Sequence, residues 1–159
     1  MSFHELLLNP SAYAPPAHVL EDLSDAEAMR RVEGAPHSVA EIVAHMAFWQ
    51  EWFLSRARGV AAPMVAPAAA GWPAAPSGSW GETRERFLSG AREAVSLGSR
   101  AEAAARRLSP AIEFPPLAHY TVNDALTHVA IHNAHHLGQV VVLRQLLGRW
   151  PPPSGSWTW

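Results

Sequence analysis

ALTHVAIHNAHHLGQVVVLRQLLG (residues 125–148) is the stretch of the sequence that decides the fold. Its apolar residues recur at the three- and four-residue spacing of a helix. Thr121 and Asp124 form a capping box just before it, and Gly148 followed by Pro151 ends it. The stretch therefore predicts one long helix. Because the chain shows no alternating run between hairpin turns, it also favours an all-α fold.

A similar capping signal, a Ser followed three residues later by a Glu, marks three further predicted helix starts, at Ser24, Ser38 and Ser79. These boxes predict a short helix over 24–32 and long helices over 38–58 and 79–108. The N-terminal part is less regular, with a short helix expected over 3–8 and another beginning at Pro15 and Pro16, since proline is tolerated in a first helical turn.

Two segments rich in proline lie between and after the predicted helices. Residues 59–78 form an Ala/Pro-rich connection that is long for a bundle loop, so we expect a crossover passing over one end of the bundle. Residues 149–159 form a Pro/Trp-rich C-terminal tail, whose tryptophans favour docking on the bundle. The sequence thus predicts a single domain over 1–159, built as a four-helix bundle with a crossover connection.

Composition excludes several classes of function. The net charge is −2, which provides no basic field for nucleic acid or an anionic membrane. Cysteine is absent, so no disulfide, zinc-thiolate site or cysteine nucleophile can form. The N-terminus lacks the features of a signal peptide, and the most apolar stretch, residues 60–76, carries four prolines and is no membrane helix. We expect a cytoplasmic protein.

Histidines are concentrated on one stripe of the last predicted helix. His128, His132 and His136 recur every four residues, and a pair at this spacing can direct two ring nitrogens at one ion. His45 lies on the inward face of the helix over 38–58 and can complete a set of three. From the residues alone, a metal site and a set of hydrogen-bonded core histidines are equally supported, because each buried imidazole needs a partner.

HSVAEIVAHMAFWQEWF (37–53) and HVAIHNAHHLGQVVVLRQLLG (128–148) together resemble the DinB/YfiT-like superfamily. The resemblance implies a four-helix bundle, often a homodimer, with metal ligands at His45, His132 and His136. His128 and His135 do not match ligand positions. It also implies zinc or nickel as the metal, and for some members a thiol S-transferase activity with bacillithiol or mycothiol. Relatives often have one long N-terminal helix, which the prolines at 15 and 16 interrupt here.

Two functions follow as expectations. The first is a metal-dependent small-molecule transferase of the thiol S-transferase type, or a hydrolase, with a low-molecular-weight thiol as a candidate substrate. No general base is identified by the sequence, although His128, His135 and Gln139 lie near the right face. The second is a non-catalytic metal-binding protein of the stress response. A pocket that gives water access to the metal favours the first, whereas a closed and fully ligated ion favours the second.

Overall fold

The computed structural model describes residues 1–10 and 12–155. Within that part of the chain it is helical and contains no strand, only an isolated bridge between Arg107 and Thr121. This confirms the predicted all-α class. None of its helices is long and apolar enough to cross a membrane. The elements are α1 (Phe3–Leu7), α2 (Pro16–Val19), α3 (Asp25–Met29), α4 (Val39–Ala57), η1 (Ala68–Gly71), α5 (Trp80–Gly98), α6 (Ala101–Ala105), η2 (Pro115–Leu117) and α7 (Val122–Leu146).

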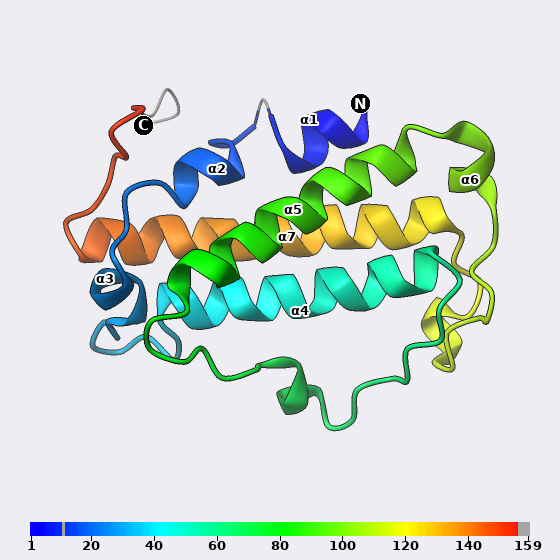
Figure 1. The fold of residues 1–159 in the computed structure, drawn as a ribbon, viewed down its shortest axis with the longest axis horizontal. Coiled ribbons are helices and arrows are strands. Elements are labelled where there is room, and N and C mark those ends of the chain that lie inside the picture. The colour runs from blue at the N-terminus through cyan, green and yellow to red at the C-terminus, as the bar shows by residue number, and fades with distance from the viewer. Residues whose placement is uncertain (11, 156–159) are drawn as a thin grey trace.

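Three long helices, α4, α5 and α7, form the body of the molecule (Figure 1). α4 and α5 begin at the same end, and α7 runs in the opposite direction. The short helix α1 packs against α5 and α7, and α2 packs against α7. The N-terminal segment is interrupted, as expected: α1 ends at Leu7. Pro15 and Pro16 stand at the N-cap and first position of α2, because proline lacks the amide hydrogen that a helix interior requires.

Local capping signals account for most helix starts. The predicted boxes at Ser24, Ser38 and Thr121 are all present, with the side-chain oxygen accepting from the amide three residues later. The predicted box at Ser79 is wrong, because the Ser79 side chain makes no capping hydrogen bond.

The amino end of α5 is instead capped by a side chain from α3. The carboxylate of Asp25 accepts from the amide of Gly78 at 2.9 Å and from that of Trp80 at 3.1 Å. A negative side chain at this position also interacts favourably with the helix dipole. A contact across more than fifty residues therefore replaces the local box.

The second long helix is shorter than predicted, ending at Gly98 and not near Leu108. A Cβ at Gly98 would lie 2.1 Å from Cδ2 of Phe3, so α1 packs directly on the backbone here. The Ser99 hydroxyl then takes up the carbonyl of Ser96, which competes with helix continuation. Leu108 itself donates its amide to the carbonyl of Tyr120 at 3.0 Å, outside any helix. The short helix over 24–32 likewise ends earlier, at Met29.

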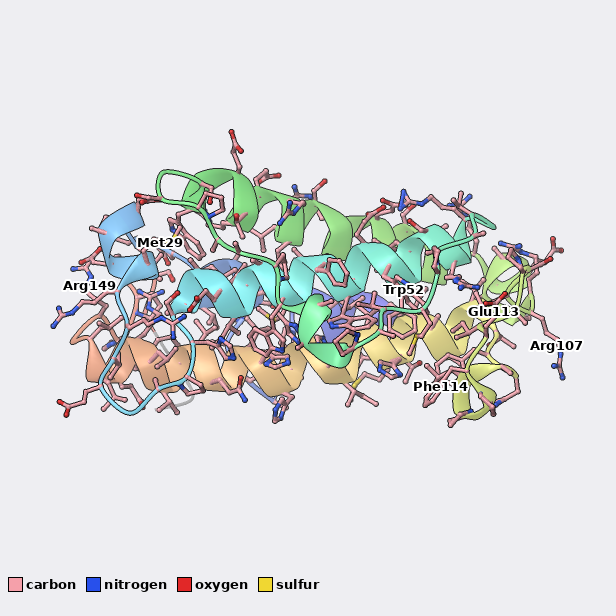
Figure 2. The ribbon with its side chains drawn as sticks, turned by 90° about the horizontal axis from the view of Figure 1, so that it is seen from below. Met29, Trp52, Arg107, Glu113, Phe114 and Arg149 are labelled. Carbon is pink, nitrogen blue, oxygen red and sulfur yellow. The ribbon has the colours of Figure 1, made fainter. Side chains whose placement is uncertain are left out.

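The connection over 59–78 passes along the side of α4 and not, as expected, over one end of the bundle (Figures 1 and 2). Two α4 side chains hold it there. The indole of Trp52 donates to the carbonyl of Pro63 at 2.8 Å, and Arg56 donates to the carbonyl of Ala62. This path brings η1 and the residues that follow it against the middle of α4.

The buried core has two apolar halves with a polar layer between them. In that layer Asn133 donates to the side chain of Gln50 at 2.9 Å, and Gln50 donates to the carbonyl of Phe87 at 2.8 Å. Gly90 makes room for this chain, because a Cβ there would lie 2.3 Å from Nε2 of Gln50. The layer links α4, α5 and α7 at the level where the histidines lie.

The described part of the C-terminal tail packs against the N-terminal segments. Arg144 at the end of α7 is 1% exposed and donates to the carbonyls of Val19 and Arg149. Its guanidinium also lies 5.7 Å from the ring centre of Trp150, a favourable cation–π position. The expectation that the tail docks on the bundle also rested on Trp157 and Trp159, which lie outside the described residues.

We predict that Arg144→Met lowers the free energy of unfolding by about 2–4 kcal/mol, because it removes the donors to the carbonyl of buried Val19 and to that of Arg149. The matched control is Arg107→Met, since Arg107 is exposed and points away from the bundle (Figure 2). That change should stay within about 0.5 kcal/mol. Urea unfolding measures both, and equal losses would show that the buried guanidinium does not hold the tail.

Candidate metal centre

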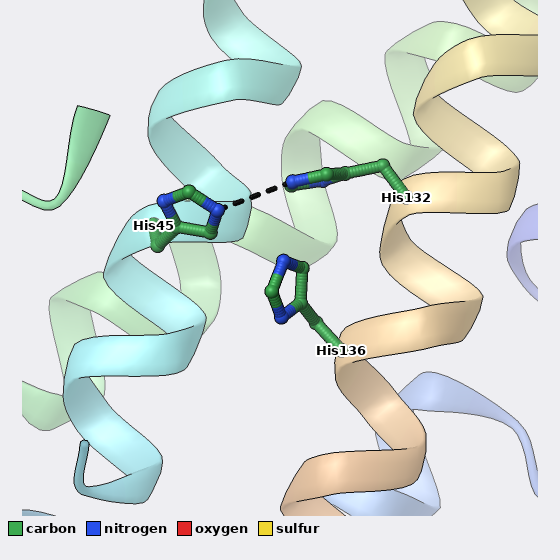
Figure 3. A group of neighbouring side chains, drawn as sticks. All are labelled: His45, His132 and His136. Carbon is green, nitrogen blue, oxygen red and sulfur yellow. Dashed lines mark hydrogen bonds between the residues drawn. The ribbon is translucent and has the colours of Figure 1, made fainter. Parts of the chain in front are cut away.

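Two helices bring three histidines together. His45 projects from α4, and His132 and His136 project from successive turns of α7 (Figure 3). One ring nitrogen from each lies within 4.8 Å of the others. His45 and His136 are buried, and His132 is partly buried. This donor set could hold a divalent metal ion, because imidazole nitrogens bind zinc at about 2.0–2.1 Å and three of them around one point can share it.

The second nitrogen of two rings is already committed. Nδ1 of His45 donates to the carbonyl oxygen of Gly71 at 2.6 Å, and Nδ1 of His136 donates to Oε1 of Gln139 at 2.8 Å. Because both acceptors are oxygens, the proton of each neutral ring sits on Nδ1 and the lone pair sits on Nε2. Hydrogen bonds of this kind orient metal-binding histidines in proteins. The residues therefore fit a metal ion.

Hydrogen bonds alone provide partners for only some of the ring nitrogens in the cluster. Nε2 of His132 lies 3.2 Å from Nε2 of His45, and it can donate there because His45 carries its proton on Nδ1. This hydrogen bond leaves Nε2 of His136 without a hydrogen-bond partner among the described residues, although that atom faces the other two rings (Figure 3). A shared ion would use all three lone pairs, which favours the metal site over the purely hydrogen-bonded one.

The electrostatics of the cluster keep its imidazoles neutral. Burial lowers the pKa of His45 and of His136, although the hydrogen bonds to Gly71 and Gln139 oppose the shift. Burial, followed by repulsion from His136 and His45, lowers the pKa of His132 to about 3. Neutral rings are the form that binds metal, so near pH 7 protons compete weakly for the site.

A tryptophan from the connection closes one side of the cluster. The Trp72 ring stacks on His45 with centroids 3.7 Å apart and an interplanar angle of 11°. Its opposite face stacks on His37 at 3.8 Å and 8°. Sequence reasoning missed Gly71 and Trp72 as parts of the site, because the connection carries no periodic pattern that places it. It also missed His37, which lies before the first residue of α4 and so outside the helical pattern.

The structure does not bring the other two α7 histidines into the cluster. Nδ1 of His128 lies 3.1 Å from the Tyr120 hydroxyl, and its ring packs near Phe53. His135 is exposed, and its Nε2 lies 3.2 Å from Nε2 of Gln139. Gln139 thus contacts both His135 and His136, which agrees with its expected place near the site.

Open pockets reach the cluster from two sides. One of about 490 Å³ is lined by His132, His128 and Tyr120. The other, of about 640 Å³, is lined by His136, Trp72 and Gln139. Each pocket is therefore bordered by one histidine of the cluster.

Comparison with known proteins adds a family to this geometry. No match was found among curated proteins or among solved structures. The family model described as the DinB superfamily matches residues 17–140, a span that runs from α2 into α7 and includes the three clustered histidines. This confirms the resemblance carried by the two histidine-bearing segments, and the chain belongs to the DinB superfamily.

Proposed function

We propose that this protein binds one zinc or nickel ion through Nε2 of His45, His132 and His136 and acts on a small molecule. The reaction class we propose is thiol S-transfer, or alternatively hydrolysis. The observation that carries the proposal is the pair of Nδ1–H···O hydrogen bonds, which turns the lone pairs of His45 and His136 towards His132.

A divalent ion on three neutral ligands would acidify a bound thiol or water at an open position. The residues of the chain prepare that position. Gly71 and Gln139 hold the ring protons at Nδ1, so that both rings keep their orientation. Trp72 covers the face of His45 and excludes water from that side, while the pockets beside His132 and His136 leave room for a substrate.

The alternative is a non-catalytic metal-binding protein of the stress response. It would be favoured by a closed site, in which protein side chains fill every position around the ion. The two open pockets support the transferase or hydrolase over this alternative. Belonging to the superfamily does not choose between them, since one fold can carry several functions.

We predict that His45→Ala, His132→Ala and His136→Ala each lower the affinity for zinc at least about tenfold, because each removes one of three ligands. His128→Ala and His135→Ala are the matched controls on the same helix, and they should change affinity much less. Isothermal titration of protein purified without a histidine tag measures all five. An effect of His128→Ala as large as that of His132→Ala would place the ion one turn nearer the start of α7.

We predict that the metal-free protein loses stability as pH falls from about 6.5 towards 3. A free imidazole in the unfolded chain takes up a proton near pH 6.5, whereas folded His132 does so only near 3. The unfolded state therefore binds more protons across this window, and stability is fully present only above it. Urea midpoints at several pH values measure the loss. His132→Ala should lose less stability over this pH range than the parent protein does. An equal loss in the two proteins would contradict a neutral His132.

Homodimerisation stays a prediction from the family resemblance. Trp72 and Trp80 do not offer an exposed apolar surface for it, because Trp80 is 4% exposed and Trp72 is stacked between two imidazoles. Light scattering at micromolar concentration tests it, with a mass of 17.3 kDa indicating a monomer.

A further inference from the structure

The larger of the two pockets, called here the Trp72 pocket, opens beside His136 between residues 35–42 and the second half of α7. Its volume of about 640 Å³ is within the range of small-molecule sites. Trp72 belongs both to this pocket and to the stack on His45, so the pocket wall and the histidine cluster are continuous.

Apolar side chains make up most of the wall. They are Ala35, Pro36, Ile42, Trp72, Val142 and Leu143. The polar lining groups come from His37, His135, His136 and Gln139, near the cluster. Gln139 already uses its oxygen on His136 and one amide hydrogen on His135, which leaves it limited capacity for a ligand.

Fixed charge is missing from this lining. No Arg, Asp or Glu lines the Trp72 pocket, and the chain contains no Lys. Arg31 lies close to the rim, because it donates to the carbonyl of Pro36, but its charge is paired with Glu41. The smaller pocket beside His132 has no cationic lining residue either, apart from its histidines. A charged group would lose part of its hydration there without gaining a partner, which weakens its binding.

We propose that the Trp72 pocket holds the body of the substrate, and that this body is uncharged and mainly apolar, of about the size of two or three aromatic rings. The proposal rests on the function proposed above for the identity of the reacting group, which would lie at the histidine cluster. A negative charge on the substrate would find a partner only at the histidine cluster. Thiols or electrophiles that carry carboxylates elsewhere are therefore poor ligands.

The test uses two dyes with the same aromatic body, N-phenyl-1-naphthylamine, which is uncharged, and 8-anilinonaphthalene-1-sulfonate, which adds one sulfonate. Each is titrated by fluorescence into metal-free protein at about pH 8, where free imidazoles are neutral. The uncharged dye should bind at least about tenfold more tightly, because the sulfonate has no cationic partner in the pocket.

Two arginine variants on α7 localise the binding. Val142 lines the Trp72 pocket and is half exposed, so Val142→Arg should add a cation without disturbing the core. Val142 also lines the neighbouring pocket against α2. Gln145→Arg is therefore the matched control, because Gln145 is exposed and lines that neighbouring pocket but not the Trp72 pocket. Val142→Arg should tighten the sulfonated dye at least about fivefold and weaken the uncharged dye, whereas Gln145→Arg should change neither.

The outcomes separate this proposal from the metal site. Any of three results would overturn the proposal of an uncharged pocket. They are equal affinity of the parent protein for both dyes, no saturable binding of the uncharged dye, and equal effects of the two arginine substitutions. Because the titrations use metal-free protein, they stand whether or not the histidine cluster binds zinc. The zinc titration of His45→Ala, in turn, decides the metal site whatever the dyes show.

Discussion

The hydrogen bond from Nδ1 of His45 to the carbonyl of Gly71 is the interaction on which the site depends. It fixes the tautomer of His45, so that Nε2 faces the two histidines of α7. The same bond anchors the connection at the middle of α4, which places Trp72 on the imidazole and at the wall of the larger pocket. The orientation of the His45 ring, the cover that Trp72 provides and the wall of the larger pocket therefore all depend on the carbonyl of Gly71.

The bundle supports this bond through a polar layer between two apolar halves. The chain from Asn133 through Gln50 to the carbonyl of Phe87 ties the three long helices together at the level of the histidines. A slip of α7 by one turn would leave the amide of Asn133 and the side-chain oxygen of Gln50 without each other, which costs more than most single contacts contribute. The layer thus holds His132 and His136 in register with His45.

Two buried arginines, Arg56 and Arg144, hold the two ends of the molecule. Arg56 donates to carbonyls of the connection and of residues 110–111, and Arg144 donates to carbonyls of α2 and the tail. Backbone carbonyls are suitable partners because the guanidinium presents five donors in fixed directions. No arginine lines either of the two pockets beside the cluster.

The sequence by itself determined the parts of this protein that are local. The capping boxes at Ser38 and Thr121 and the four-residue spacing of His132 and His136 are complete within one or two turns of helix, so pattern alone predicts them. The tertiary structure alone decided that Asp25 caps α5, that Phe3 packs on Gly98 where α5 ends, and that Gly71 and Trp72 complete the site. Each of these contacts joins segments far apart in the chain, and their energies depend on packing that no short sequence pattern encodes.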